Sequence, residues 1–336
     1  MLKVNLNEKI ESTLKLNNTK LILLALLPSI FLMFFIFGWG TITNIIFSII
    51  FLNLTNLLIS ILNKNKFIIK ENKLTYVSIF ILSLSLPPYL EWWILLIGLL
   101  FAVLISSKVF IFFGFDRFNS AMFSYAILLI FFPREMSIWP APSSLSSLPN
   151  LGFVETIIYK INPDKFIYSD AMSMATPFDL IRQNNGLMFN DLIISYKQFG
   201  VWSGIGWEWI NISFMIGGLL LLQRKVFSWH APCSMILAIT LCSMFFYDAG
   251  SSSSIGSPIF QLLGGGTMIC AWFIVTDPST SPNDNTGKFL YGFMVGVLIY
   301  LIRKYSIYPD GVAFAVLLIN SIVPLINTFS QKKIQS

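Results

Sequence analysis

Long apolar runs alternate with short polar segments along almost the whole chain. Several runs approach the ~20 residues that an α-helix needs to cross a bilayer, and some are shorter. Nearly all charged side chains fall between the runs, as expected when a charge at the bilayer centre costs about 2.5–3.5 kcal/mol or more. The pattern predicts an all-α polytopic membrane protein with about ten transmembrane helices, at roughly 21–38, 41–62, 74–88, 90–106, 118–133, 207–223, 229–247, 257–276, 287–303 and 311–328.

One long polar segment, about residues 134–206, interrupts this alternation. Its prolines and serines predict a loop, with short helices over 151–160 and 188–198. Five predicted spans precede the loop and five follow it. An odd number of spans in each half gives the halves opposite orientations in the membrane, which predicts two inverted five-helix halves. We therefore expect a cytoplasmic N-terminal segment (1–20), a first transmembrane half (21–133), the loop (134–206), a second transmembrane half (207–328) and a cytoplasmic tail (329–336).

The distribution of Lys and Arg predicts the orientation. With the N-terminus inside, fifteen of the 22 basic residues fall in inner segments, and five lie in the 134–206 loop, which is too long for the rule to count. Only Arg303 and Lys304 oppose this orientation from a short loop. Both termini are therefore expected in the cytoplasm and the long loop on the outer side.

Composition supports the membrane class and excludes several others. The chain is 55% hydrophobic and 11% charged, with a mean hydropathy of +0.74, whereas soluble domains are about 25% charged. The net charge of +6 is spread over many short loops, which argues against a nucleic-acid surface. Cys233, Cys242 and Cys270 lack the clustering of a zinc or iron–sulfur site. The single His230 cannot supply both axial ligands of a bis-His haem.

The segment with the most distinctive chemistry is Asp170-Ala-Met-Ser-Met-Ala-Thr176-Pro177, inside the long loop. It presents a threonine hydroxyl among small residues behind a carboxylate. Taken alone, such a segment is also typical of an Asx or Ser turn in an exposed loop.

The segment resembles the flavinylation sequence Asp-x-x-Ser-x-Ala-Thr of the NqrB/RnfD family. Two longer segments, 261–278 with its Gly-rich run ending in Thr-Asp-Pro and 302–320 with Tyr-Pro-Asp-Gly-Val-Ala, are similar to signatures of the RnfD (RsxD) branch. Phe118-Asn-Ser-Ala121 resembles that branch's Phe-Asn-Pro-Ala. The resemblance runs from about 20 to 328, and Met174 stands where the family commonly has Gly or Gln.

This resemblance implies a subunit of an ion-translocating Rnf complex in the bacterial inner membrane, with the Thr176 loop in the periplasm. FMN would be joined to Thr176 through a phosphoester made from FAD by a flavin transferase, which recognises Asp170, Ser173 and Ala175. The chain would relay electrons to neighbouring subunits, including a second FMN-carrying one, and couple this to Na⁺ or H⁺ movement. The family implies a second, non-covalent flavin such as riboflavin. No complete catalytic activity, catalytic side chain or metal ligand is expected from this chain alone.

Two other functions remain open at the level of sequence. A channel or transporter for small polar solutes also uses inverted repeats and needs no flavin, and a scaffold would merely hold partners. Gly264–Gly266 favours close helix packing over unwound backbone that admits a ligand. Asp277 and Asp310 are expected to cap the helices that follow them rather than to line an ion path. Trp207 and Trp209 are typical of an aromatic belt, with stacking on a flavin as the alternative.

Overall fold

The structure is a computed structural model of the 336-residue chain. It describes residues 2–62, 74–106, 117–146, 149–163, 166, 173–184, 186–251, 253–306, 308 and 310–335, without the side chains of 2–17, 56, 58–62, 74, 249 and 331–335. Every regular element in these ranges is a helix, and extended pairing is confined to the isolated bridges Pro140–Ser173 and Phe199–Gly204. The prediction of an all-helical chain is confirmed.

The first group of helices follows the predicted spans closely. Asn119 caps α5, because its Oδ1 atom accepts the N–H of Met122 at 3.1 Å. Pro133 opens the short helix that follows, where its missing N–H costs nothing. The helices are α1 (Leu2–Phe37), α2 (Gly40–Leu62), α3 (Leu74–Ser85), α4 (Trp92–Ser106), α5 (Ser120–Phe131) and α6 (Pro133–Ser137).

Three short helices lie in the long polar loop. The predicted helices over 151–160 and 188–198 are confirmed as α7 (Phe153–Ile161) and α9 (Phe189–Ser195). The third, α8 (Pro177–Arg182), was not expected. It begins directly after Thr176, so the residue singled out by the sequence stands at a helix start.

The second group also matches the prediction, except for one broken segment. The expected span 257–276 consists of three short pieces, the first two separated by Gly264–Gly266. Ser257 starts the first piece, because its Oγ atom accepts the N–H of Phe260 at 3.2 Å. The helices are α10 (Trp207–Gln223), α11 (His230–Phe245), the 3₁₀ turn η5 (Asp248–Gly250), α12 (Pro258–Leu263), α13 (Thr267–Ile269), the π-helical η6 (Cys270–Ile274), α14 (Asn285–Tyr305) and α15 (Val312–Gln335).

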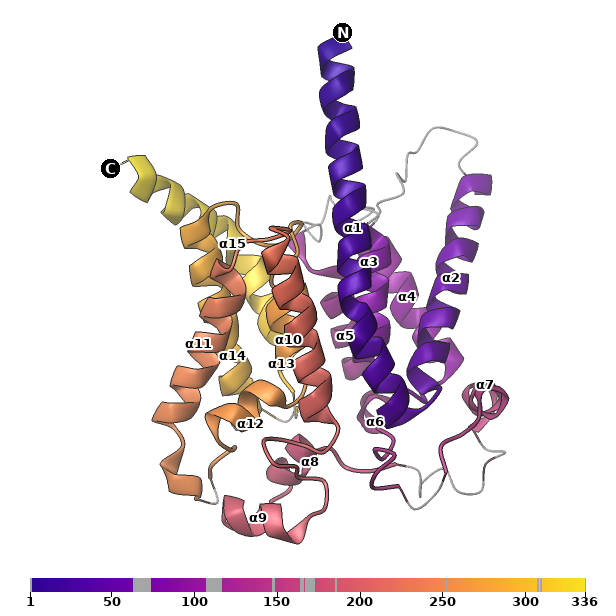
Figure 1. Ribbon diagram of the computed structural model, residues 1–336, viewed down its shortest axis with the longest axis vertical. Helices are drawn as coiled ribbons and strands as arrows, with labels where there is room; N and C mark the ends of the chain where they lie inside the picture. The colour runs from indigo at the N-terminus through magenta and orange to yellow at the C-terminus, as the bar shows by residue number, and fades with distance from the viewer. Residues whose placement is uncertain are drawn as a thin grey trace.

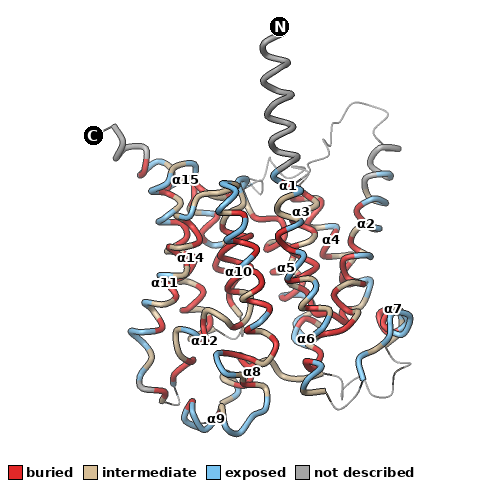
Figure 2. The backbone as a smooth tube through the Cα atoms, in the orientation of Figure 1, coloured by how far each residue is buried: buried red, intermediate tan, exposed pale blue. Residues whose placement is uncertain are grey.

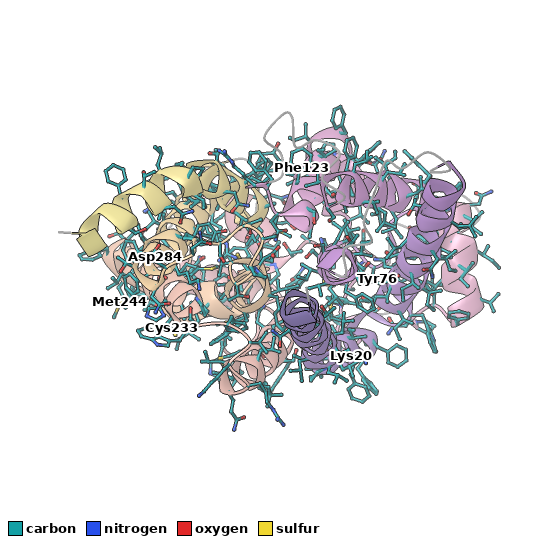
Figure 3. All side chains as sticks on the ribbon, turned by 90° about the horizontal axis from the view of Figure 1, so that it is seen from above. Lys20, Tyr76, Phe123, Cys233, Met244 and Asp284 are labelled. Atoms are coloured by element: carbon teal, nitrogen blue, oxygen red, sulfur yellow. The ribbon has the colours of Figure 1, made fainter. Side chains whose placement is uncertain are left out.

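The two groups stand side by side with their helices running roughly lengthwise (Figures 1 and 3). α1 packs against α10 of the second group as well as against α2 and α3, and α5 packs against α15. Both chain termini lie at one end of the bundle, and α7, α8 and α9 lie at the other, which we call the loop end (Figure 1). This arrangement agrees with the prediction that the termini share one side and the long loop takes the opposite side.

Many large apolar side chains are exposed on the bundle, and exposed positions alternate with buried ones along its helices (Figure 2). On α1, Leu24, Leu27, Phe31 and Phe35 form one exposed face, while Ser29 on the other side is fully buried. Water-soluble proteins expose few such contiguous faces. Among the described residues, three helical stretches are long and apolar enough to cross a membrane, Asn18–Phe37, Asn285–Tyr305 and Val312–Ser330, and five further apolar helices are shorter.

A small-residue contact joins α11 to α14. Gly292 and Gly296 are spaced as in the G-x-x-x-G pattern that lets membrane helices approach closely. A Cβ atom on Gly292 would lie 2.2 Å from the carbonyl oxygen of Ala231, and one on Gly296 would lie 2.5 Å from that of Met235. The two backbones therefore touch along this line.

Replacing Gly292 by Ala should separate α14 from α11, because the added methyl group meets backbone rather than a side chain that can rotate. Overpacking of this kind costs about 1–3 kcal/mol, so we expect a fall of several degrees in the thermal unfolding midpoint of the purified complex. Gly152→Ala is the matched control, since its new Cβ atom would have nothing closer than 3.5 Å. Equal midpoints for the two variants would contradict this account of the contact.

Candidate functional site

The segment before Thr176 is tied to the chain between α6 and α7. Ser173 pairs with Pro140 in an isolated antiparallel bridge, and the N–H of Met174 donates to the carbonyl oxygen of Trp139 at 2.9 Å. Ser173, Ala175 and Thr176 are all half-buried. Asp170, the first residue of the motif, lies outside the described residues. The structure thus brings three of the four predicted site residues together in one short extended segment.

Thr176 is the N-cap of α8. Its hydroxyl donates to Oδ2 of Asp179 at 2.6 Å, its N–H donates to the same oxygen at 2.9 Å, and its Oγ1 accepts the N–H of Asp179 at 3.3 Å. These reciprocal bonds are a capping box, and Pro177 occupies the first helical position, where proline is favoured. The spacing Thr-Pro-x-Asp was the signal in the sequence that could have revealed α8.

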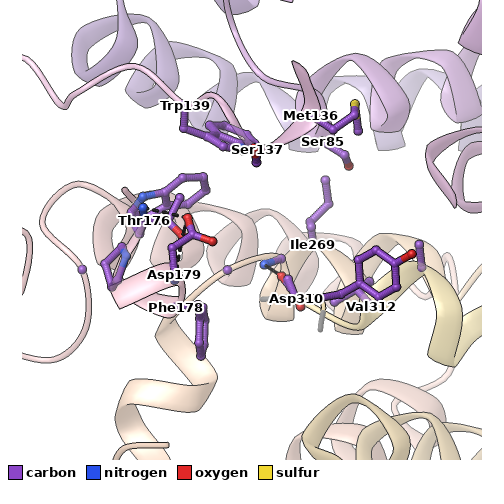
Figure 4. Close-up of a pocket in the computed structure, with 18 of the residues that line it drawn as sticks. Ser85, Met136, Ser137, Trp139, Thr176, Phe178, Asp179, Ile269, Asp310 and Val312 are labelled. Carbon is purple, nitrogen blue, oxygen red and sulfur yellow. Dashed lines mark hydrogen bonds between the residues drawn. The ribbon is translucent and has the colours of Figure 1, made fainter. Parts of the chain in front are cut away.

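Thr176 also lines a cavity of about 450 Å³ between the two helical groups (Figure 4). The first group contributes α1, α3, α5 and α6, and the second contributes α10, α13 and α15, while the α8 segment covers the loop end. Most of the wall is apolar, with a few polar groups. Representative lining residues are Met33, Ser85, Met122, Tyr125, Trp139, Thr176, Asp179, Arg182, Trp207, Ile269, Asp310 and Val312.

Two indole rings form the wall beside Thr176. Trp139 and Trp207 meet edge to face with ring centroids 4.8 Å apart, and Phe37 packs against both, at 5.9 and 5.4 Å. Such aromatic contacts hold the rings in fixed positions. Trp209, by contrast, is 52% exposed and packs against Trp202 away from the cavity. Of the two tryptophans considered for a stacking role, only Trp207 reaches the cavity.

Gly264–Gly266 forms unwound backbone along the same cavity, although helix packing was the favoured expectation for these glycines. Gly265 has φ +53°, a conformation that favours glycine. The amide of Asn211 donates to the carbonyl oxygens of Leu263 and Gly265 at 2.9 and 3.0 Å, and its oxygen accepts the N–H of Met268. One buried side chain therefore satisfies three of the backbone groups at the break, as an apolar interior requires.

The guanidinium group of Arg303 joins this break to the Thr176 segment. Arg303 is 4% exposed and donates to Gln261 O at 3.0 Å, to Gln261 Oε1 at 3.1 Å and to Thr267 Oγ1 at 2.9 Å. It pairs with Asp310 at 3.1 Å, and its Cζ atom lies 4.4 Å from the centre of the Phe178 ring. Of the two charges that opposed the predicted orientation, Arg303 is therefore buried and paired with Asp310, so it does not behave as a loop charge.

Asp310 and Asp277 do not cap the helices that follow them, contrary to expectation. Asp310 accepts from Gly266 N at 2.7 Å and from Arg303 on the cavity wall. Asp277 closes a turn by accepting from Ser279, and it also accepts from Asn119 Nδ2 at 3.0 Å. Each carboxylate accepts a backbone N–H outside a regular helix. The apolar pattern of the sequence did not indicate these non-helical segments.

Glu208 has a supporting role at the start of α10. It is 6% exposed, and its Oε2 atom accepts the N–H groups of Trp202 at 3.1 Å and Ser203 at 3.3 Å. This carboxylate fixes the turn that leads from the loop into α10 and so sets the position of Trp207. Elsewhere, the described part of the chain contains no group of three His, Cys, Asp or Glu side chains suited to a metal ion.

Comparison with known proteins gives one consistent answer. The model of the NQR2, RnfD, RnfE family matches residues 10–335. The chain belongs to this family. Its relatives in it include the D subunit of the ion-translocating oxidoreductase complex of Cellvibrio japonicus, 41% identical over 92% of this chain and 88% of the relative. The D subunits of the complexes of the same name from Pseudomonas aeruginosa and Aliivibrio salmonicida are each 35% identical, over 94% of this chain and 90% and 92% of their own lengths.

Membership of the NQR2, RnfD, RnfE family confirms the resemblance inferred from the motifs. The match includes the segment of Thr176 and the segments of Arg303 and Asp310. Part of the cavity wall is thus built from segments that carried the resemblance, although these segments lie far apart in the sequence.

Arg303→Met should destabilise the protein strongly. The variant leaves Asp310 and the Gln261 carbonyl oxygen without their buried partner, and breaking a buried pair in this way costs about 3–5 kcal/mol. The thermal unfolding midpoint of the purified complex reports the loss. Lys304→Met is the neighbouring control, because the Lys304 ammonium lies over the rings of Phe246 at 4.6 Å and Tyr305 at 5.8 Å, contacts worth about 0.5–1 kcal/mol each at exposed sites. A midpoint for Arg303→Met equal to that of Lys304→Met would refute the linking role.

Proposed function

We propose that the chain is the membrane subunit of an Rnf-type ion-translocating oxidoreductase complex and that FMN esterified to Thr176 relays electrons between its neighbours. The family and the names of the relatives support the first part. The observation that carries the second part is the opening of the Thr176 position onto a large, aromatic-walled cavity. Complete catalysis requires the other subunits, and the coupled ion is Na⁺ or H⁺.

The cavity fits a tethered flavin in size and in chemistry. Its volume of about 450 Å³ falls within the roughly 300–1,000 Å³ of small-molecule and cofactor sites. Its wall combines apolar side chains with the indoles of Trp139 and Trp207, and its charged residues are Asp179, Arg182 and Asp310. A flat aromatic ring joined to a polar phosphate needs this combination.

Attachment changes the bonding of Thr176. The hydroxyl loses its proton, Oγ1 gains a bond to the phosphorus of FMN, and FAD as the donor releases AMP. The ester has no O–H to donate to Asp179, and its phosphate adds a negative charge near that carboxylate. Arg182, on the wall of the same cavity, supplies a positive charge there. When bound, the flavin supplies one- and two-electron transfer, and the protein holds and surrounds it.

The other motif residues serve the modification in this proposal. Asp170, Ser173 and Ala175 belong to the sequence that a flavin transferase reads, and Met174 replaces the family's usual Gly or Gln. A second, non-covalent flavin such as riboflavin belongs to the same hypothesis, without assigned residues.

The proposed topology has ten spans in two inverted five-helix halves, 21–133 and 207–328, separated by a periplasmic loop over 134–206. Support comes from the places where α5 and α15 begin. Asn119 begins α5 beside Asp277, whereas α15 begins after Asp310, beside Arg303 and the Thr176 segment. These packed helices therefore start at opposite ends of the bundle. The termini, 1–20 and 329–336, face the cytoplasm of a bacterium, whose inner membrane holds the complex together with a second FMN-carrying subunit.

Thr176→Ala should abolish the covalent flavin. Peptide mass spectrometry across 165–185, after co-expression with the flavin transferase, should find the FMN adduct on Thr176 in the wild type and none in the variant. Ser137→Ala is the matched control, because it removes another hydroxyl on the same cavity wall. Thr176→Ser should regain part of the adduct. An unmodified Thr176 in the wild type would contradict the electron-carrier role and favour the solute channel.

Fluorescence should report whether the tethered ring occupies the cavity. Indoles close to a flavin quench its emission by donating an electron, so Trp207→Leu should raise the flavin fluorescence of the native complex several-fold. The mass of the adduct should stay unchanged. Trp209→Leu removes an indole that points away from the cavity and should leave the emission as it is. A rise in the Trp209 variant alone would show that the ring lies elsewhere.

A further inference from the structure

The helix α7 carries a largely exposed apolar face, on which Phe153 also meets the Trp39 ring edge to face at 5.3 Å. Four large side chains on one side of the helix are 38–65% exposed, namely Phe153, Val154, Ile158 and Ile161. The opposite side, with Thr156, Tyr159 and Lys160, is buried. A nine-residue helix with this division is amphipathic, yet the side that faces outward is the apolar one.

The buried side fixes α7 to the beginning of α2. The ammonium of Lys160 donates to the carbonyl oxygen of Gly40 at 3.3 Å and to Oδ1 of Asn44. Burial lowers the pKa of the Lys160 amine well below its usual range. The Tyr159 ring packs on Tyr89 at 5.6 Å. The outward direction of the apolar face is therefore set by specific contacts, and the face is a stable surface.

The apolar face of α7 continues the apolar surface of α2. Ile46, Ile50, Leu54 and Leu57 are 36–55% exposed along α2, in a helix whose stretch Gly40–Thr55 is apolar in average composition. Figure 1 shows α7 nearly end-on beside the lower end of α2, so its axis runs across the direction of the spans. A helix in this position lies where the α2 surface leaves the bilayer.

We propose that α7 is an interfacial helix that lies flat at the loop-end surface of the membrane and buries its apolar face among lipid chains. Amphipathic helices bind the boundary between headgroups and acyl chains in this way. The four outward side chains carry no charge. On the helix itself, the charged residue beside them is Glu155, exposed at the rim, where its Oε2 atom accepts the N–H of Gly152 at 2.9 Å. Lipid is favoured over a protein partner because the same uncharged surface runs on into α2.

Interfacial anchoring gives α7 a role that does not depend on the flavin. It holds the chain between the first helical group and the Thr176 segment at a fixed depth, through Lys160 on one side and lipid on the other. The inference stands or falls independently of covalent modification at Thr176.

Site-directed spin labelling of the whole complex in lipid nanodiscs tests the proposal. Cys233 and Cys242 are replaced by Ala, while Cys270 is fully buried and is left in place. A nitroxide is then attached at Val154→Cys or Ile158→Cys. Ile50→Cys on α2 is the lipid-facing control, and Lys197→Cys in the exposed part of the loop is the water-facing control. All four side chains are exposed, so replacing them by a labelled cysteine should leave the fold unchanged.

Collision rates with oxygen, which concentrates in lipid, and with a nickel chelate, which stays in water, distinguish the outcomes. Both α7 labels should resemble the Ile50 label, with a ratio of oxygen to nickel collisions several-fold above that of the Lys197 label. Nickel accessibility equal to that of the Lys197 label would overturn the proposal by placing the face in water. Protection from both reagents would overturn it as well, because a protein partner would then cover α7.

Discussion

The site depends on one buried positive charge. Arg303 binds the carbonyl oxygen where the broken span ends, the hydroxyl of Thr267 where it resumes, and the carboxylate of Asp310 at the start of α15. Its flat face lies on Phe178, one residue beyond Pro177. A planar group with five donors suits such a junction, which a lysine could not satisfy. Through Arg303 the loop that carries Thr176 is fastened to the membrane bundle.

The same region shows how an apolar bundle tolerates non-helical backbone. Carbonyl and N–H groups without partners are costly where water is excluded. Asn211 and Asp310 bind the freed groups of Gly264–Gly266, and both side chains come from outside the broken span. The break is therefore a built feature of the wall, and it creates the room in which the cavity lies.

The helices were predictable because burial in lipid imposes long apolar runs, and each predicted run contains helix in the structure. The broken span was missed, since 261–276 reads as one apolar run and its polar partners Asn211 and Arg303 lie far away in the sequence. Thr176 was singled out by a motif, but its neighbours Trp139 and Arg182 came only from tertiary structure, which also separated Trp207 on the cavity wall from the exposed Trp209. Asp179 was within reach of sequence reasoning, because a threonine followed by proline and an acidic residue indicates a helix start.

The capping box of α8 has a consequence for the maturation of the protein. An enzyme that modifies Thr176 must grip the peptide around it, yet here the hydroxyl is engaged by Asp179 and the preceding backbone is paired with the Trp139–Pro140 stretch. The enzyme can reach the hydroxyl only when the Thr176 segment is separated from Asp179 and from the Trp139–Pro140 stretch. In the proposed function, the flavin is therefore attached to Thr176 while this segment is still unpaired, and packing of the segment against the bundle afterwards encloses it.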